Sequence, residues 1–384
     1  MNSELLGILM MMGTTVLAAQ DRPQPMIGAI RWDAFYGQEG AVKEVERSMG
    51  PKKFHFRLPF FAKIRSDAKV TIDGDSQITM DREIAYAADA GLNYWAFVDY
   101  WEEKGLSIAL RRYLDAKDKR GLRFCFIEEG ARLEGHRETA WPRLVKFFKN
   151  PDYLKVADGR PLMFVFGKPA KLDRADFLKL GEACTAAGLR KPYLVLMGWN
   201  PQNDWKEAQG LGFDAVSAYA AGGQYQGAMW PYAQLTNHVK NYYWGTCRQH
   251  GIPTVTFAAA GWDTRPRIEH PQSWRKCKAV PDPTPPALQK PLIDAVTATP
   301  GQLTTHLKDA IEWTVQNRDL TPANAVIIYA WNENDEGGWL IPTLNADGTP
   351  NTERLDAIRP LLKKDGRHAQ QSAGADTLPR AAQP

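Results

Sequence analysis

The fold is decided by the stretch DREIAYAADAGLNYWAFVDYW (81–101), in which a helical segment leads through Gly91 into an apolar strand. Its first half places apolar residues at helical spacing, and a glycine just past the last helical residue commonly ends a helix. Its second half is a short apolar run of strand length. A helix that leads directly into such a run is typical of βα units around a parallel sheet.

The same alternation recurs along the whole chain. The sequence predicts eight strands, at residues 26–36, 92–101, 123–130, 160–167, 192–200, 213–220, 253–263 and 324–333. Parallel neighbours need helical crossovers, and eight such units close the sheet. We therefore predict an α/β fold, a single-domain (β/α)8 TIM barrel over residues 26–363. A doubly wound open sheet is the rival, but no GxGxxG or Walker loop follows any strand.

Composition narrows the function classes. The 384 residues are 44% apolar and 24% charged, which suits a soluble protein with a large core. The net charge is only +4 and both signs are interspersed, so we predict no nucleic-acid partner. The 13 tryptophans stand out, because tryptophan needs a partner for its N–H and often lines polar clefts. Such rings either cover the C–H faces of sugars or belong to the core.

The two ends of the chain differ from the barrel. Residues 1–20 contain an apolar run that is short for a membrane span and ends near Leu17-Ala18-Ala19, a small-residue cleavage site. We predict a signal peptide, hence a secreted or periplasmic protein without a stable membrane span. A basic start is missing, so an uncleaved tail or an anchor is the alternative. Residues 364–384 are polar and aperiodic and predict a disordered tail.

The cysteines and histidines give no metal signature. The chain has four cysteines and no CxxC, HExxH or clustered ligand set, so we predict neither a metal nor another cofactor. Cys247 and Cys277 could form a disulfide in an exported protein or remain thiols. The oligomeric state is left open.

Polar and aromatic residues gather where the predicted strands end, which is where (β/α)8 barrels place their active sites. Strand alternation lets only one of Glu128 and Glu129 face inward, and we choose Glu128. Arg57 either binds substrate or pairs with a barrel carboxylate, and Asp99 either orients a sugar hydroxyl or holds Arg31. The predicted substrate-binding residues from these patterns are Trp32, Asp33, Arg57, Asp99, Tyr100, Trp101, Glu128, Trp199, Tyr219, Trp262, Asp263, Trp331, Asn332 and Trp339.

The strongest local signal is AVIIYAWNENDEGGWLIPT (325–343), an apolar strand that delivers two glutamates to the barrel mouth. If Glu333 and Glu336 share one helical turn, both carboxyl groups point the same way. Glycosidic cleavage uses one protonated and one ionised carboxyl group, and close spacing pushes two pKa values apart. We therefore predict Glu333 and Glu336 as the catalytic pair. The alternative is an acidic turn that caps the last helix.

The segment WNENDEGG (331–338) resembles the WNEW-x-EG motif of glycoside hydrolase family 99 and its WbsX-like relatives. FHFRLPFF (54–61), PDYLKVADGRPLMFVF (151–166) and AGWDTRPR (260–267) agree with it. The resemblance implies a (β/α)8 barrel that acts on α-linked glycans such as α-mannosides. It also implies that Asp263 and Arg265 bind substrate.

In that family the glutamate matching Glu333 takes the proton of the sugar 2-hydroxyl, which attacks C1 with net retention. The glutamate matching Glu336 acts as general acid and then as general base. Two departures put the substrate in doubt. Asn334 and Asp335 replace the usual tryptophan and a small residue or histidine, and GGWLIPT replaces the usual continuation.

Three functions fit these patterns. The leading hypothesis is a glycoside hydrolase, endo-acting if the cleft is open, with an oligosaccharide or polysaccharide substrate. The second is a WbsX-like glycosyltransferase in polysaccharide assembly, against which two absences count: no predicted barrel strand ends in a DxD metal motif, and no dinucleotide-binding glycine motif occurs. The third is a glycan-binding barrel without activity, which would not need two carboxyl groups at this spacing.

Overall fold

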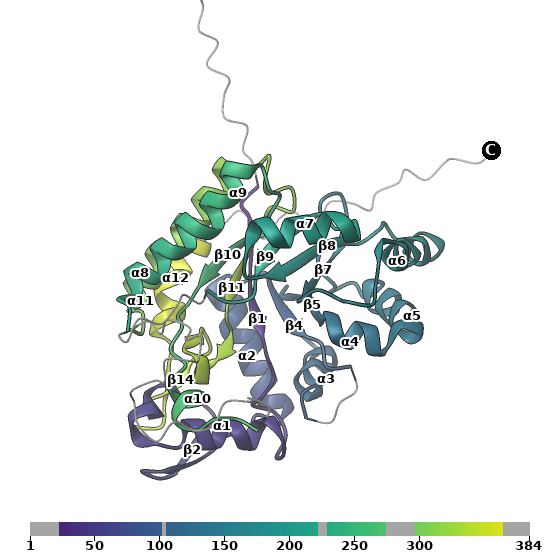
Figure 1. Cartoon of the computed structure of the whole chain (residues 1–384). Helices are drawn as coiled ribbons and strands as arrows, with labels where there is room; N and C mark the ends of the chain where they lie inside the picture. The colour runs from purple at the N-terminus through teal and green to yellow at the C-terminus, as the bar shows by residue number, and fades with distance from the viewer. Residues whose placement is uncertain (1–22, 102–104, 222–228, 274–295, 364–384) are drawn as a thin grey trace, which may run out of the picture.

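The computed structural model describes residues 23–101, 105–221, 229–273 and 296–363 (Figure 1). Within them, eight parallel strands follow the order β10-β11-β1-β4-β5-β7-β8-β9. An isolated parallel bridge between Val216 and Thr254 brings the two ends of this order together. The barrel strands are β1 (Met26–Arg31), β4 (Tyr94–Val98), β5 (Arg123–Glu129), β7 (Arg160–Phe166), β8 (Tyr193–Gly198), β9 (Ala215–Ala218), β10 (Thr256–Ala259) and β11 (Ala325–Tyr329).

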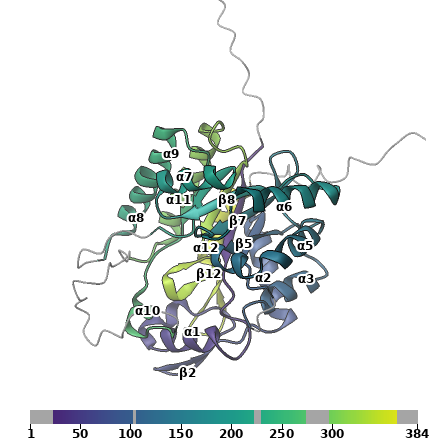
Figure 2. The same ribbon diagram turned by 45° about the vertical axis from the view of Figure 1, so that its right-hand side comes forward.

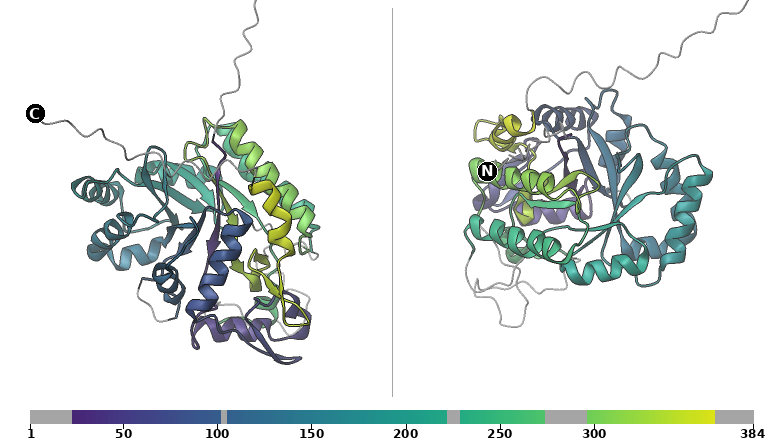
Figure 3. Two further views of the ribbon diagram at one scale, coloured as in Figure 1. Left: turned by 180° about the vertical axis from the view of Figure 1, so that it is seen from behind. Right: turned by 90° about the horizontal axis from the view of Figure 1, so that it is seen from above.

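Helices surround the strands, as the view from above shows (Figure 3). The α-helices are α1 (Ala41–Met49), α2 (Gln77–Ala90), α3 (Ile108–Asp115), α4 (Gly130–Gly135), α5 (Arg137–Phe148), α6 (Arg174–Ala186), α7 (Pro201–Leu211), α8 (Tyr232–His238), α9 (Gly245–His250), α10 (Arg265–Glu269), α11 (Pro300–Gln316) and α12 (Glu353–Leu362). The nearly closed barrel with helices between its strands confirms the predicted (β/α)8 fold.

Local sequence explains the helix α2 and the strand β4 that follows it. The Ser76 side chain caps the helix by accepting a hydrogen bond from the backbone N–H of Thr79. Gly91 ends it with a φ of 94°, a conformation that glycine adopts without steric cost. Every residue of β4 is buried, because helices cover one face of the sheet and the barrel interior the other.

The connection over residues 50–80 is more structured than the sequence predicts. It contains a 3₁₀ turn and a small antiparallel hairpin, and α2 begins at Gln77 rather than at residue 81. The hairpin was missed because its first strand is exposed on every residue and has no apolar face to mark it. These elements are η1 (Lys52–Arg57), β2 (Lys63–Ser66) and β3 (Lys69–Thr71).

The last strand is shorter than predicted, and this shortening shapes the site. β11 ends at Tyr329, and the chain then forms a tight hairpin made of β12 (Asn332–Glu333), the 3₁₀ turn η3 (Asn334–Glu336) and β13 (Gly338–Trp339). Figure 2 shows β12 above α1 and α10, and both of these helices contact η3. The remaining short elements are β6 (Lys155–Val156), the π-helical turn η2 (Val239–Trp244), β14 (Thr343–Leu344) and β15 (Pro350–Asn351).

Several sequence predictions concern residues outside the described ranges. The predicted signal peptide (1–20), the predicted disordered tail (364–384) and Cys277 lie there, whereas Cys247 is described and buried. Among the helices that the structure describes, none is long and apolar enough to cross a membrane.

Candidate active site

A hollow of about 570 Å³ lies at the carboxyl ends of the barrel strands. Seven of the predicted site residues line it: Trp32, Tyr100, Trp199, Tyr219, Trp262, Glu333 and Glu336. The other lining residues are Ala41, Val98, Leu106, Glu129, Arg132, Phe166 and Arg267. The hollow therefore combines aromatic walls with two glutamates, as the strand-end pattern predicts.

The tight hairpin after β11 presents both glutamates. Glu333 ends β12, where it pairs with Gly338, and Glu336 ends the 3₁₀ turn that follows. The carbonyl oxygen of Glu336 accepts a hydrogen bond from the backbone N–H of Asp263 at 2.7 Å. The loop after β10 thereby fixes the end of the turn.

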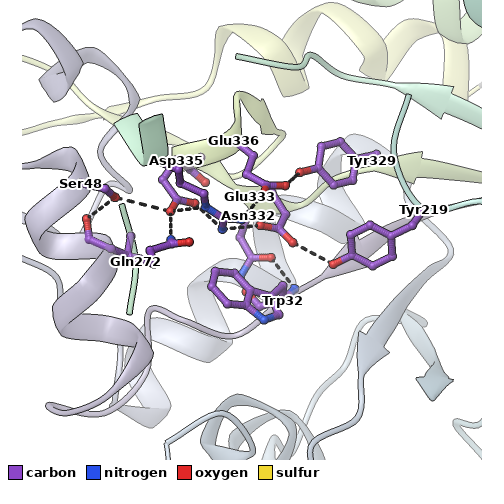
Figure 4. Close-up of polar contacts among 12 residues, drawn as sticks. Trp32, Ser48, Tyr219, Gln272, Tyr329, Asn332, Glu333, Asp335 and Glu336 are labelled. Carbon is purple, nitrogen blue, oxygen red and sulfur yellow. Dashed lines mark hydrogen bonds and ion pairs between the residues drawn. The ribbon is translucent and has the colours of Figure 1, made fainter. Parts of the chain in front are cut away.

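The guanidinium of Arg267 joins the two carboxylates. It donates to Oε2 of Glu333 at 3.1 Å and to Oε1 of Glu336. Its Nε also donates to Oδ2 of Asp335 at 2.7 Å, so three acidic side chains surround one cation. Figure 4 shows these acidic groups converging with the dashed contacts among them.

Two tyrosines complete the hydrogen bonds of the pair. The Tyr219 hydroxyl, just beyond β9, donates to Oε1 of Glu333 at 2.8 Å, and the Tyr329 hydroxyl of β11 donates to Oε2 of Glu336 (Figure 4). Glu333 is only 3% exposed. Burial and the nearby charge of Glu336 raise the pKa of Glu333 to about 8, although Arg267 acts to lower it. A pKa raised to this value favours the protonated form of Glu333 at neutral pH.

Asn332 places one wall of the hollow. Its side-chain oxygen accepts from the backbone N–H of Trp32 at 2.9 Å, and its Nδ2 donates to the Trp32 carbonyl at 2.6 Å. The indole N–H of Trp32 donates in turn to the Tyr100 hydroxyl at 2.8 Å. Asn332 thus acts on the hollow by holding Trp32, with its own side chain buried behind it.

A second wall is made of aromatic rings that contact one another. Trp199, just past β8, is 45% exposed, and its ring lies edge-on to Phe166 with centroids 6.1 Å apart. The ring of Phe166 packs against that of Tyr219, with centroids 4.7 Å apart. The three rings therefore form a continuous row from the exposed Trp199 to Tyr219, which donates to Glu333. Such exposed faces suit the apolar C–H faces of a sugar.

Two predicted residues lie behind the hollow in a buried ion network. Arg31 donates to Asp33 at 2.9 Å and to Glu83 of α2 at 2.7 Å. The indole N–H of Trp331 donates to Glu83 at 2.6 Å. The structure therefore places Asp33 and Trp331 among the strands and α2, where they hold the barrel together.

A second buried group lies between the barrel and α5. Arg143 of α5 donates to Asp99 at 2.9 Å, and the Trp101 indole donates to Glu128 at 3.3 Å. Glu128 follows the alternation of Phe126, whose ring packs on Phe147 of α5 at 4.9 Å. Asp99, Trp101 and Glu128 accordingly point away from the hollow, while Glu129 lines it. The inward-facing member of the glutamate pair is the opposite of the one that we chose from the sequence.

The remaining predicted residues lie in buried contacts around the β12–β13 hairpin. Arg57 of η1 donates to Asp263 at 2.5 Å and is buried, which realises the alternative of pairing with a barrel carboxylate. Arg265 donates to the same carboxylate at 2.8 Å. Burial acts to raise the pKa of Asp263, but the hydrogen bonds from Arg265 and the charge of Arg57 hold it below its usual value. Trp339 is buried against Arg354, whose guanidinium lies 3.9 Å from the ring centroid.

Sequence reasoning missed Arg267, which binds both glutamates. Its signal was present, because Arg267 is the last residue of the AGWDTRPR stretch on which the family resemblance rests. Glu129, Arg132, Phe166 and Tyr329 were also missed. Phe166 and Tyr329 belong to apolar strand sequences, in which nothing separates a lining ring from a core ring. Among the described residues, no group of histidine, cysteine, aspartate and glutamate has the arrangement to hold a metal.

Comparisons with known proteins place this chain in a family. A family model described as glycosyltransferase WbsX matches residues 126–349. No curated protein matches the chain in sequence. A solved structure of a GH99 endo-α-mannosidase from Bacteroides thetaiotaomicron, in complex with Bis-Tris propane, has a TM-score of 0.53 at 16% identity. The match covers 87% of this chain and 94% of that one, and it shows a shared fold.

A second structure of a GH99 endo-α-mannosidase from the same organism has a TM-score of 0.49 at 13% identity, with 87% of this chain and 94% of that chain covered. The family model covers more than half of the 384 residues and contains the WNENDEGG motif. The predicted resemblance is thereby confirmed: this chain belongs to the WbsX glycosyltransferase family and has the (β/α)8 fold of GH99 enzymes.

Proposed function

We propose that this protein is a glycoside hydrolase that cleaves α-linked glycans, with Glu333 and Glu336 as its catalytic pair. The observation that carries the proposal is the shared contact of both carboxylates with Arg267 in an aromatic hollow. The fold shared with structures described as endo-α-mannosidases supports an α-mannoside as the first substrate to test. We also propose that the protein acts outside the cytoplasm after removal of residues 1–20, which N-terminal sequencing of the mature protein tests.

The Glu333/Glu336 pair can supply the one protonated and the one ionised carboxyl group that such a reaction needs. Cleavage requires one carboxylate that accepts a proton and one carboxyl group that gives a proton to the leaving oxygen. In the route that the family resemblance implies, Glu333 takes the 2-hydroxyl proton while that oxygen attacks C1. Glu336 protonates the departing oxygen, and then activates the water that opens the anhydro sugar.

This route needs the shared proton on Glu336 when the sugar is bound. A 2-hydroxyl that donates a hydrogen bond to Glu333 stabilises its ionised form and so favours that transfer. Tyr219 assists, because its hydroxyl already donates to the same carboxylate. The Arg267 guanidinium donates hydrogen bonds to both Glu333 and Glu336, so its positive charge stabilises whichever of the two is ionised.

A glycosyltransferase is the second candidate, because the family model carries that description. The aromatic walls of the hollow would suit a glycosyltransferase equally well, since both kinds of enzyme bind a sugar chain. The two differ in the acceptor of the glycosyl group, which is water in one and a second sugar in the other.

The deciding experiment incubates the purified protein with α-mannans and other α-linked polysaccharides and resolves the products by chromatography. We expect shorter oligosaccharides from at least one of them. Glu333→Gln and Glu336→Gln should each reduce the rate by roughly 10²-fold or more. Glu312→Gln is the control, because Glu312 lies on the surface of α11 and pairs only weakly with Lys308 at 3.7 Å.

Other outcomes point elsewhere. Transfer from a nucleotide-sugar donor, without hydrolysis, would establish the transferase. Binding of a glycan by both wild type and the two glutamine variants, with no turnover, would establish a non-catalytic barrel.

A further inference from the structure

Asp335 sits at the centre of the acidic hairpin although the family resemblance gives it no role. Its side chain is buried, and in the sequence it lies between the two proposed catalytic residues, Glu333 and Glu336. It binds Arg267 through two oxygens, with Oδ2 at 2.7 Å from Nε and Oδ1 at 2.9 Å from Nη2. Paired, parallel contacts of this kind are the strongest that arginine makes with a carboxylate.

Two more side chains fix Asp335 from outside the hairpin. Gln272 donates to Oδ2 at 2.8 Å, and the Ser48 hydroxyl of α1 contacts the same oxygen at 3.4 Å (Figure 4). Four donor contacts hold this buried carboxylate in one position. Asp335 therefore lies in a fixed ion pair with Arg267.

The charge count in this cluster has a consequence for the pair. One guanidinium faces three acidic groups, so full ionisation would leave two uncompensated negative charges in a buried site. Since Asp335 holds the two-point contact with Arg267, both uncompensated charges would fall on Glu333 and Glu336. A buried pair that would carry two uncompensated negative charges keeps one proton, which leaves a single negative charge.

We propose that Asp335 is a positioning residue that keeps one proton on the Glu333/Glu336 pair, by occupying Arg267 and adding a fixed negative charge beside it. This inference rests on the proposed function for its catalytic meaning, but the proton itself can be detected without a substrate. The groups that face Glu333 from the elements packed around it are Tyr100, Tyr219, Arg267, Tyr329, Asp335 and Glu336.

Substitutions of Asp335 and of Arg267 should shift the pH at which the pair loses its proton in opposite directions. Asp335→Asn deletes a negative charge and leaves Arg267 free to stabilise the ionised pair, so the proton should leave at lower pH. Arg267→Gln deletes the positive charge, so the proton should persist to higher pH. A merely structural role would destabilise both variants without opposite shifts.

The first measurement is the free energy of unfolding from about pH 5 to about pH 10. Because folding raises the pKa of Glu333 from 4.5 to about 8, the native protein carries an extra proton between these pH values, and its stability falls until the pH has risen through about 8. The pH at which this fall ends should move down by roughly one pH unit in Asp335→Asn and up in Arg267→Gln. In Glu333→Gln the fall should disappear.

Asp176→Asn is the matched control. Asp176 is buried and accepts two hydrogen bonds from Nη2 of Arg137, at 2.6 and 2.8 Å, far from the hollow on α6. Its loss should leave the end of the fall at the same pH as in the wild type. The second measurement is the alkaline limb of the pH–rate profile on an active glycan, which should shift in the same direction as the end of the stability fall.

The two proposals fail separately. A glycan screen without product would overturn the hydrolase proposal, while the pH at which the stability fall ends would still report on Asp335. An unchanged end of the fall, shifts in the same direction, or failure of both Asp335→Asn and Arg267→Gln to fold would overturn the role of Asp335, whatever the enzyme does.

Discussion

Asn332 and Trp32 exchange two hydrogen bonds across 300 positions of sequence, one in each direction between an amide side chain and a backbone unit. The contact ties the end of the last barrel unit to the end of the first, where the barrel closes. Because Asn332 is buried, neither bond can be replaced by water without opening the wall.

Asn332→Ala should therefore destabilise the protein by about 1–3 kcal/mol, since it removes one hydrogen bond from each buried backbone group of Trp32, although the Trp32 carbonyl keeps its contact with the Ala34 N–H. It should also reduce kcat/KM, because the Trp32 ring would no longer be fixed against the hollow. Denaturant unfolding and glycan turnover measure the two effects. Asn345→Ala, which removes an exposed contact with Thr349, should change stability by about 0.5 kcal/mol or less. Equal losses in the two variants would contradict the closing role of Asn332.

The pH dependence of turnover follows from the raised pKa of Glu333. Above about pH 8 Glu333 loses its proton, so the pair no longer holds the proton that the leaving oxygen needs. We therefore expect kcat/KM to fall as pH rises through that region, in initial-rate measurements at low substrate concentration. A rate that keeps rising to about pH 10 would show that the retained proton is not used.

Gly337 is the turn residue that lets the acidic hairpin pack against the loop after β10. Its φ is 85°, and a Cβ there would lie 2.3 Å from the Asp263 nitrogen. Gly337→Ala should cost about 3 kcal/mol or more and displace Glu336.

Gly348 provides the matched comparison for this substitution. Its φ is 83°, yet a Cβ would meet no atom within 4 Å. Gly348→Ala should cost about 1 kcal/mol from backbone strain alone and leave turnover unchanged. Thermal unfolding and product yield test both. If Gly337→Ala and Gly348→Ala had the same effects, the close contact between Gly337 and the loop after β10 would not matter for stability or turnover.

Trp199 offers the most exposed ring face of the hollow. Trp199→Ala should raise KM by about threefold to tenfold with a smaller effect on kcat, because the loss is of binding rather than of chemistry. Trp199→Phe should recover most of the affinity, since it keeps a flat apolar face. Michaelis–Menten analysis on a soluble α-linked oligosaccharide distinguishes these results. A fall in kcat at constant KM would instead place Trp199 in the chemical step.

The sequence determined the barrel and the position of its two neighbouring glutamates. Each strand is a local apolar run, and each preceding helix ends at a local signal such as Gly91, so neighbouring residues alone predict the eight units. The same holds for Glu333 and Glu336, because their position just past a buried strand fixes them at the barrel mouth.

Only the tertiary structure decided which charges meet. Arg57 pairs with Asp263 and Arg267 with three acidic side chains, and these partners lie 66 to 206 positions apart in sequence. Glu128 faces α5 while Glu129 faces the hollow, because the twist and register of the closed barrel set the direction of each side chain. Periodicity shows that two adjacent carboxylates diverge, but the packing of α5 against β5 chooses between them.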